Sequence, residues 1–206
     1  MRYKFPMLFS IASERIWCKC LMCFYKIRTP LIAWLWGVKH GAGIRFQGKT
    51  IMRTRKVGEI VLGSKVIFNS QGSTNLVGLS GPTILDTLGG GKIKVGNNSG
   101  FSSVVMSSRS SITIGSNVKV GGNVRIFDHD YHSLEYEYRR TAEDRIHIRT
   151  KPVIIEDDCF VGTNAIILKG THLGARTIVA AGSVVFGLDV PPDSLVKGNP
   201  ARVIVK

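Results

Sequence analysis

A six-residue repeat is the sequence feature that most limits how this chain can fold. Nine units open with a large apolar residue, usually continue with glycine, alanine or an acid, and carry a small or aliphatic residue four positions after the first. A half-buried strand alternates every ~2 residues and a helix repeats every ~3.6, so neither template explains the pattern. The units start at Val95, Phe101, Ile114, Val120, Ile155, Val161, Ile167, Leu173 and Val179.

A period of six suits a chain wound into a triangular prism. One short strand and one tight corner form a side, so three units complete a coil of ~18 residues in which every sixth residue points inward. The opening residues of successive coils then stack into a continuous core, while glycine and asparagine supply the positive φ that tight corners need. The repeat predicts a mainly β protein, a parallel β-helix that occupies residues 41–206.

The repeat breaks once, between Ile126 and Pro152. The inserted stretch holds His129, His132 and His147, three of the five histidines in the chain. Because a prism gains no packing from such an insertion, we expect an extruded loop at about residues 127–152 that carries function.

We expect residues 1–40 to form a separate basic amphipathic helical segment. Apolar residues recur at helical spacing from about Ser10 to Arg28, and Pro30 then restarts a second short helix from Leu31 to Val38. Two fates of this helical hairpin remain open: contact with an anionic membrane face, or packing against the domain or a sister subunit.

The net charge of +14 is concentrated at this end, because residues 1–57 hold twelve Lys or Arg and one acid. Such an excess attracts an anionic partner. Nucleic acid is disfavoured, since Phe24, Tyr25, Trp34 and Trp36 lie in apolar helical runs and not on a basic strand surface.

The cysteines indicate a reducing compartment. Cys18, Cys20 and Cys23 crowd one predicted helix, where disulfides between neighbours are geometrically awkward and a fourth close metal ligand is missing. No stretch reaches the ~18 consecutive apolar residues of a membrane-spanning helix. We therefore expect a cytoplasmic protein, with no metal, that can lie peripherally at the inner membrane face.

The repeats resemble those of the bacterial hexapeptide-repeat acyltransferases, and the ending Gly198–Ile204 closely matches that family's Gly-Asn-Pro-Ala-Arg-Val-Ile. The resemblance implies a left-handed parallel β-helix, a homotrimer and acetyl-CoA as co-substrate. The basic N-terminal segment is similar to that of members found in capsule or exopolysaccharide synthesis. The function expected from the resemblance is O-acetyl transfer to a hydroxyl of a sugar or polysaccharide precursor.

The stretch around His132, with Arg139 after it, resembles the His-Pro-Leu-Asp segment of sugar O-acetyltransferases, in which the histidine is the general base. A hydroxyl needs its proton removed during attack, and imidazole titrates in the right range. The resemblance therefore implies His132 as the base, with His129 on the same loop as the reserve candidate.

Polar neighbours of these histidines could orient the imidazole or hold the acceptor. Asp128 and Asp130 flank His129, and they could equally form a solvated turn paired with Arg139 and Arg140. Ser102 occupies the place where several relatives have an asparagine near the acceptor.

For the donor, the resemblance implies that acetyl-CoA lies along a prism edge between two subunits. Small residues let the narrow pantetheine arm of acetyl-CoA approach the backbone, although the corners of the prism also require glycine and alanine. A guanidinium suits the phosphates of the cofactor. The implied donor-site residues are Thr163, Ala181, Gly182, Arg202 and Lys206.

Three other functions remain open. Members of the same fold acylate serine, antibiotics or amino-sugar nitrogens. A γ-type carbonic anhydrase would need three zinc-binding histidines spread over neighbouring coils, whereas three of these histidines crowd one loop. A non-catalytic β-helix scaffold would not bind acetyl-CoA.

Overall fold

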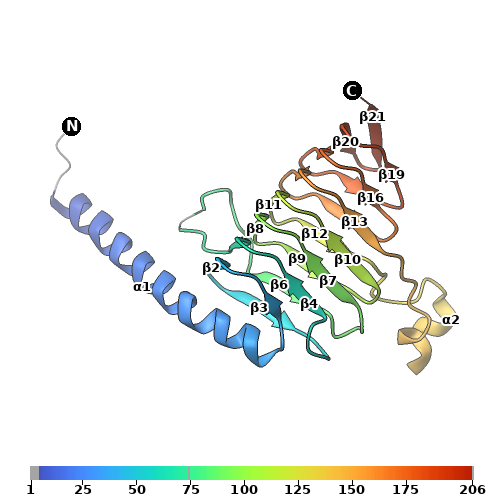
Figure 1. Cartoon of the computed structure of the whole chain (residues 1–206), viewed down its shortest axis with the longest axis horizontal. Coiled ribbons are helices and arrows are strands. Elements are labelled where there is room, and N and C mark those ends of the chain that lie inside the picture. The colour runs from blue at the N-terminus through green and yellow to red at the C-terminus, as the bar shows by residue number, and fades with distance from the viewer. Residues whose placement is uncertain (1–4, 74, 206) are drawn as a thin grey trace.

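The computed structural model describes residues 5–73 and 75–205, and most of them form a parallel β-helix of three sheets (Figure 1). Each coil passes through sheets A, B and C in turn. Sheet A contains β1 (Lys39–His40), β4 (Ile60–Leu62), β7 (Lys92–Val95), β10 (Ser111–Ile114), β13 (Val153–Ile155), β16 (His172–Leu173) and β19 (Asp189–Val190). Sheet B contains β2 (Arg45–Gln47), β5 (Ile67–Asn69), β8 (Gly100–Ser102), β11 (Lys119–Gly122), β14 (Phe160–Val161), β17 (Ile178–Val179), β20 (Ser194–Gly198) and the antiparallel β21 (Ala201–Val205). Sheet C contains β3 (Thr50–Arg53), β6 (Thr83–Asp86), β9 (Val105–Ser107), β12 (Arg125–Phe127), β15 (Ile166–Leu168) and β18 (Val184–Val185).

The predicted inward stack of apolar residues is confirmed. Between Ile155 and Leu173, as between Ile167 and Val185, paired residues lie one 18-residue coil apart. The buried columns are Leu62, Val95, Ile114, Ile155, Leu173 and Val190 in sheet A; Phe46, Phe68, Phe101, Val120, Val161, Val179 and Val196 in sheet B; and Met52, Leu85, Met106, Ile126, Ile167 and Val185 in sheet C.

One of the nine units is misaligned in the prediction. The buried apolar residue after Phe101 is Val104 and not the expected Val105, and Met106 follows Phe101 by five residues. This corner is one residue short, and Ser103 closes it with φ +49°. The strands adjust through a register shift between Val120 and Gly122.

The prediction of a single break in the repeat is wrong. The described residues between β5 and β6 form a second, smaller excursion at the corner between sheets B and C. Asn123 fixes it, because its side chain accepts from the Ser80 N–H at 2.8 Å and donates to the Gly78 carbonyl at 2.9 Å. The early coils have longer corners than the clean repeats, so this part of the chain has no regular six-residue spacing that the excursion would visibly interrupt.

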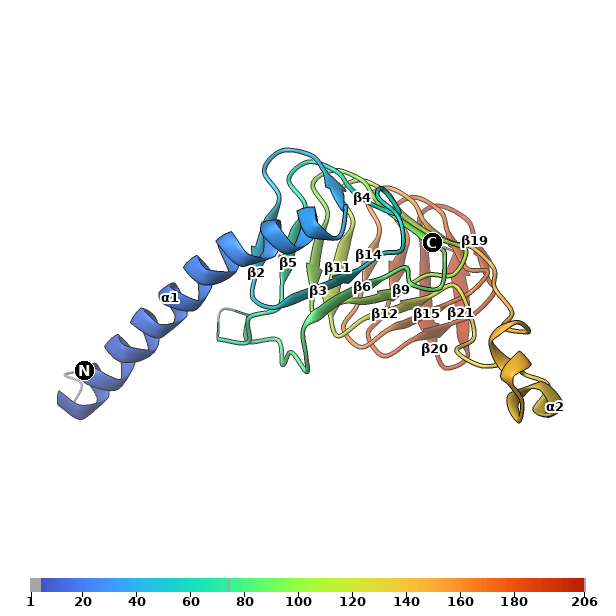
Figure 2. The same ribbon diagram turned by 90° about the horizontal axis from the view of Figure 1, so that it is seen from below.

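The predicted loop between β12 and β13 is confirmed. It leaves the prism at the corner between sheets C and A and carries α2 (Tyr136–Arg139) and the 3₁₀ helix η1 (Ala142–Arg145), as Figures 1 and 2 show. Its base is closed by backbone bonds from Lys151 N–H to the Asp128 carbonyl and from Asp130 N–H to the Arg149 carbonyl.

The N-terminal segment is one helix, α1 (Phe5–Leu35), and the predicted break at Pro30 is wrong. Proline removes one helical hydrogen bond, but Thr29 and Ala33 on either side of it are fully buried against the first coil. The helix ends later, where Gly37 takes φ +65° and the Val38 N–H bonds to the Ala33 carbonyl at 2.9 Å.

Within the described ranges, no helix is long and apolar enough to span a membrane.

A ladder of three charges on sheet A gives the fold a pH dependence. The two ring nitrogens of His172 lie 2.9 Å from Glu156 Oε1 and 2.8 Å from Asp189 Oδ1. The hydrogen bond to Glu156 is the main cause that raises the pKa of His172 above 6.5, and the same bond lowers the pKa of Glu156 below 4.5.

We expect His172→Gln to lower the free energy of unfolding mainly at pH values between the folded-state pKa of Glu156 and that of His172. A raised histidine pKa stabilises the fold below about pH 6.5 and loses that effect as pH rises through the folded-state pKa. The lowered Glu156 pKa makes the effect disappear again in acid. The groups are partly exposed, so the expected loss is about 1 kcal/mol or less. Unfolding curves of both proteins from pH 4 to 9 would measure it; a pH-independent difference contradicts the assignment.

Candidate active site

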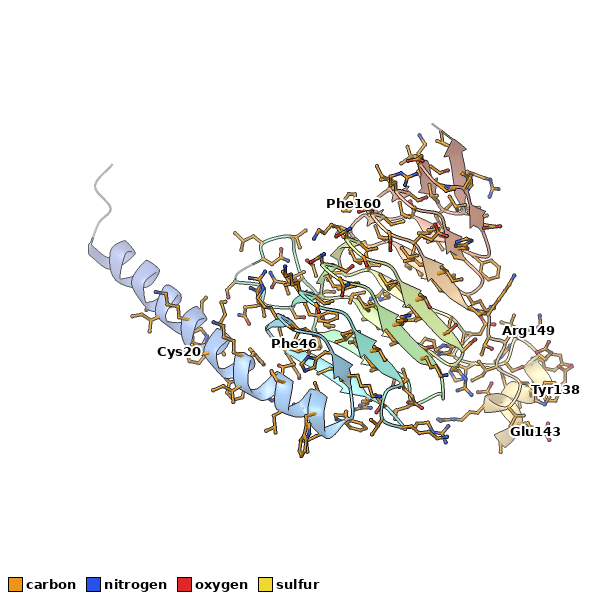
Figure 3. The ribbon with its side chains drawn as sticks, viewed as in Figure 1. Cys20, Phe46, Tyr138, Glu143, Arg149 and Phe160 are labelled. Carbon is orange, nitrogen blue, oxygen red and sulfur yellow. The ribbon has the colours of Figure 1, made fainter. Side chains whose placement is uncertain are left out.

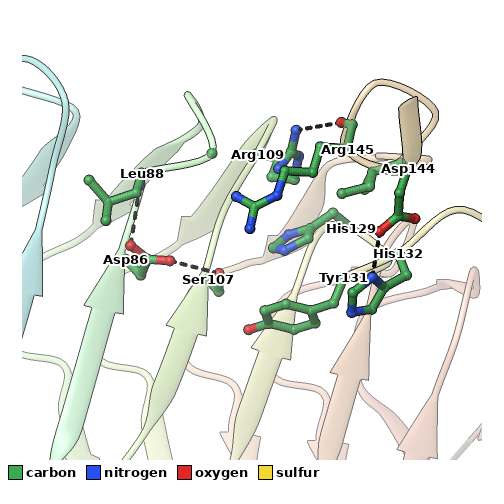
Figure 4. Close-up of a pocket in the computed structure, with 11 residues that line it drawn as sticks. Asp86, Leu88, Ser107, Arg109, His129, Tyr131, His132, Asp144 and Arg145 are labelled. Atoms are coloured by element: carbon green, nitrogen blue, oxygen red, sulfur yellow. Dashed lines mark hydrogen bonds and ion pairs between the residues drawn. The ribbon is translucent and has the colours of Figure 1, made fainter. Parts of the chain in front are cut away.

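A polar cleft of about 290 Å³ opens where the extruded loop leaves the prism. Figure 4 shows His129 at the cleft between Arg109 and Tyr131. The walls come from three coils and from the loop, and the lining residues are Asp86, Leu88, Gly89, Ser107, Arg109, His129, Tyr131, His132, Asp144, Arg145 and Ile148.

The coil register brings distant residues to the cleft. Asp86 pairs with Ser107, and Ser107 pairs with Phe127, so these positions form a vertical row that ends beside the loop. The Ser107 hydroxyl donates to Asp86 Oδ2 at 3.2 Å. The sequence interpretation missed Asp86, Ser107 and Arg109. The signal that could have found them is the coil register, which places the ends of β6 and β9 next to the end of β12.

Asp128 and His129 form a buried acid–imidazole pair. Asp128 is fully buried and His129 is 6% exposed, with 3.0 Å between Asp128 Oδ1 and His129 Nδ1. The carboxylate also accepts from the Ser108 hydroxyl at 2.6 Å and from the backbone N–H groups of Arg109 and Ser110 at 2.8 Å. Asp128 therefore holds the imidazole through Nδ1, which leaves Nε2 as the ring nitrogen that can exchange a proton with a group in the cleft.

The charge state of Asp128 is set by two opposing causes. Burial alone would raise its pKa, but the hydrogen bonds from His129, Ser108 and the two amides together lower the pKa below its ordinary value. The carboxylate thus stays ionised at neutral pH, and it favours the tautomer in which His129 Nδ1 carries the proton.

His132 is in a more open environment. Its Nδ1 lies 2.6 Å from Asp144 Oδ2, and its side chain is 71% exposed. The hydrogen bond from His132 is the main cause that lowers the pKa of Asp144. Both histidines line one cleft and each has a carboxylate partner, but only His129 is enclosed by the fold.

Tyr131 supplies an aromatic wall of the cleft beside His129. Its ring centroid lies 4.7 Å from that of His129, and the Tyr131 and Phe127 rings are nearly perpendicular, with their centroids 5.2 Å apart. Partial burial is the main cause that raises the pKa of Tyr131, so its hydroxyl is neutral at physiological pH.

Asp130 and Arg139 lie in the loop but do not line the cleft. Asp130 pairs with Lys169, which reaches it from the end of β15. The Arg139 guanidinium donates to the Ser133 and Leu134 carbonyls at 2.8 and 2.7 Å, so it holds the loop's own backbone. Arg140 lies 5.0 Å from the Tyr136 ring.

The residues expected at the donor site meet at the corner between sheets B and C. The Gly182 N–H bonds to the Thr163 carbonyl at 2.9 Å, and a Cβ on Gly162 would come within 2.5 Å of the Ala181 nitrogen. A Cβ on Gly182 would meet nothing within 4 Å, and Ala181 is also exposed. The backbone at this corner is therefore accessible from solvent.

The C-terminal hairpin reaches the same edge. The Gly198 N–H bonds to the Ser183 hydroxyl at 3.2 Å, and Arg202 follows on β21 with its side chain exposed. Lys206, the last expected donor residue, lies outside the described residues.

The histidines and the residues expected to bind the donor lie at opposite edges of sheet C. His129 follows the end of β12, whereas Thr163 and Gly182 precede β15 and β18. Ser102 also lies on the donor side, where its hydroxyl accepts from Asn75 Nδ2 at 2.9 Å, so one chain does not bring Ser102 to the histidines.

Among residues 5–73 and 75–205, no group of three or more His, Cys, Asp or Glu side chains is arranged to hold a metal ion. His129, His132 and His147 instead have separate carboxylate partners: Asp128, Asp144 and Glu143.

Comparison with known proteins finds similarity to hexapeptide-repeat proteins and acetyltransferases. A family described as "hexapeptide repeat of succinyl-transferase" matches residues 152–186. The putative acetyltransferase YvoF of Bacillus subtilis (strain 168) is 34% identical over 116 residues, which cover 55% of this chain and 60% of that relative. The chain thus aligns with less than two thirds of this curated relative.

Two solved acetyltransferases share the fold over nearly the whole chain. The hexapeptide-repeat acetyltransferase VCA0836 of Vibrio cholerae O1 biovar eltor, solved with acetyl coenzyme A, is 29% identical with a TM-score of 0.53. A maltose O-acetyltransferase of Clostridium difficile 630 is 25% identical with a TM-score of 0.54. Each alignment covers 95% of this chain and 87% of the other.

The expected resemblance to the hexapeptide-repeat acetyltransferases is confirmed, and the chain has the left-handed parallel β-helix of that class. Its structural neighbours include one that binds acetyl-CoA.

Proposed function

We propose that this chain transfers acetyl from acetyl-CoA to a hydroxyl of a sugar or polysaccharide precursor. The observation that carries the proposal is the buried Asp128–His129 pair at a polar cleft, on the loop that interrupts the repeat. The acetyltransferases that share the fold support the donor, and the maltose O-acetyltransferase supports a sugar acceptor.

His129 is the proposed general base. With Nδ1–H donated to Asp128, its Nε2 has the free lone pair that takes the proton from the acceptor hydroxyl. The hydroxyl oxygen attacks the thioester carbonyl carbon and the new C–O bond forms. The C–S bond then breaks, and the proton on His129 passes to the departing thiolate, which leaves as the CoA thiol. The ester product and the free enzyme result, with no covalent enzyme intermediate.

The sequence first suggested His132 as the base. We choose His129 instead because its carboxylate partner is held in place before the reaction. Groups fixed before the reaction need no reorganisation as charge develops. Asp128 is held by a hydroxyl and two backbone amides, whereas Asp144 lies on the short 3₁₀ helix of the loop. His132 is exposed, and its proposed part is to shape the cleft mouth beside the acceptor.

The lining of the cleft suits a polyhydroxylated acceptor. Asp86 and Asp144 present carboxylate oxygens, and Arg109 presents guanidinium N–H groups, so both partners of a sugar hydroxyl are available. Arg109 is fixed by a 3.1 Å bond from Nη2 to the Arg145 carbonyl. Tyr131 adds a flat apolar face beside His129.

The proposed donor site is the edge formed by Thr163, Ala181 and Gly182, with Arg202 near the phosphates. Small residues and open space above Gly182 suit the narrow pantetheine arm, and the exposed guanidinium suits the anionic end of the cofactor.

We propose the homotrimer that the family resemblance implies, and the two opposite edges of sheet C support a site shared between copies. Donor and base belong to different edges of one prism, so a second copy is needed to bring its histidine to the donor edge of the first. In a closed cyclic oligomer, every copy supplies its histidine to one neighbour and its donor edge to another.

Incubation of the purified chain with labelled acetyl-CoA and a pool of nucleotide sugars and glycans tests the proposal. The expected product is an acetylated carbohydrate whose label mild alkali releases, because esters are cleaved under conditions that spare amides. Alkali-stable label on an amino sugar or on serine would overturn the hydroxyl assignment. Absence of acetyl transfer together with absence of acetyl-CoA binding would leave the scaffold alternative.

A further inference from the structure

Helix α1 is attached to the prism only by its C-terminal half. Thr29 and Ala33 are fully buried on the first coil, and Ile32 packs against the core there. Figures 1 and 2 show the rest of the helix projecting away from the coils. With 31 residues at ~1.5 Å each, the helix is roughly 46 Å long.

The outward face of α1 is an apolar stripe. Its members recur at spacings of three and four, so they lie on one side of the helix. All have exposed side chains, which reach 76% at Ile27 and 73% at Trp34. Figure 3 shows side chains around Cys20 projecting from this free part of the helix. The apolar stripe consists of Ile16, Cys20, Phe24, Ile27, Leu31 and Trp34.

The surroundings of the stripe are basic. Lys19 and Lys26 are exposed beside it, and the sequence contains no acidic residue from Arg15 to Gly58. Residues 1–57 carry +11 of the net charge of +14, so the remaining residues, 58–206, are nearly balanced. Most of the excess positive charge thus lies at the end of the chain that bears the stripe.

From this combination we infer that α1 lies in the surface of an anionic lipid membrane. Tryptophan and phenylalanine favour the membrane–water interface, and flanking lysines are attracted by anionic headgroups. A second copy of the helix would also cover the apolar stripe, but it would bring two strongly basic segments together, which costs free energy. Charge complementarity therefore favours the membrane.

Sedimentation of the full-length protein with vesicles tests the inference. We expect binding to phosphatidylcholine vesicles that contain phosphatidylglycerol, and at least about fivefold weaker binding to phosphatidylcholine alone, since each basic residue near an anionic surface contributes to attraction. All three tryptophans lie between residues 17 and 36, so binding should shift tryptophan emission to shorter wavelength. Equal binding to both vesicles, or binding to neither, overturns the inference.

Phe24→Ser/Ile27→Ser/Trp34→Ser should reduce the partition coefficient at least about tenfold, because each large apolar side chain contributes to membrane burial. The matched control is Leu76→Ser/Phe186→Ser, which removes exposed apolar side chains elsewhere and should bind like the wild type. Ile16→Ser/Leu31→Ser checks the result with a milder change. Unchanged vesicle binding by the triple variant would overturn the role of the apolar stripe. If the wild type binds no vesicles and the triple variant forms a smaller oligomer than the wild type, the stripe is covered by a second copy instead.

Discussion

His129→Asn is expected to lower kcat by on the order of 100-fold or more, as loss of a general base does. An asparagine amide can still donate to Asp128, so the buried carboxylate keeps a partner while the base is removed. The measurement is the initial rate of acetyl transfer at saturating acetyl-CoA and acceptor. We expect the Michaelis constant for acetyl-CoA to change little, because His129 is proposed to take the acceptor's proton and is not among the residues proposed to hold the cofactor.

His132→Asn is the matched control, since it makes the same change on the same loop. We expect a fall of less than about tenfold, because an exposed side chain that only shapes the cleft mouth is not required for proton transfer. The reverse order, with His132→Asn the more damaging change, would move the base to His132.

Phe68→Ala is expected to lower the free energy of unfolding by about 3–5 kcal/mol, the range for a large side chain removed from a packed core. Phe68 is fully buried and lies between Phe46 and Phe101, with ring centroids at 5.6 and 5.0 Å and nearly parallel planes. Neighbouring coils cannot collapse into the gap without breaking their strand register. Urea unfolding followed by circular dichroism would measure the loss.

Phe160→Ala provides the comparison for Phe68→Ala. Phe160 lies in the same sheet but on its outer face, where it is 48% exposed, so its removal should cost less than about 1 kcal/mol. Equal losses for the two variants would mean that the inward face of sheet B has been assigned to the wrong residues.

The coils could be predicted from sequence because their physics is local and repeated. From Ile155 to Val185 the inward residues follow one another at a fixed spacing, and corner residues such as Asn164 are those that accept positive φ. The earlier coils were harder to predict, because a five-residue unit at Phe101 and the excursion held by Asn123 interrupt the six-residue spacing of inward residues. Pro30 misled for another reason: tertiary contacts at Thr29 and Ala33 outweigh the lost hydrogen bond.

The sequence predicted the histidines of the candidate site but not which residues hold them. The histidines stood out because they interrupt the repeat, but their order of importance depends on burial, which one short stretch of loop cannot reveal. Asp128 is held by Ser108 and the amides of Arg109 and Ser110, which arrive from the previous coil, whereas Asp130 pairs with Lys169 of the following coil. The pairing of His132 with Asp144 depends on how the loop folds back.

A crystal structure of the protein with coenzyme A and a glycan acceptor would measure the geometry of the reaction directly. The expected result places an acceptor hydroxyl within about 3.2 Å of His129 Nε2, the reach of a general base, and the CoA sulfur on the edge near Thr163 of a neighbouring copy. A hydroxyl that faces His132 instead, or a coenzyme bound away from that edge, would contradict the proposed chemistry.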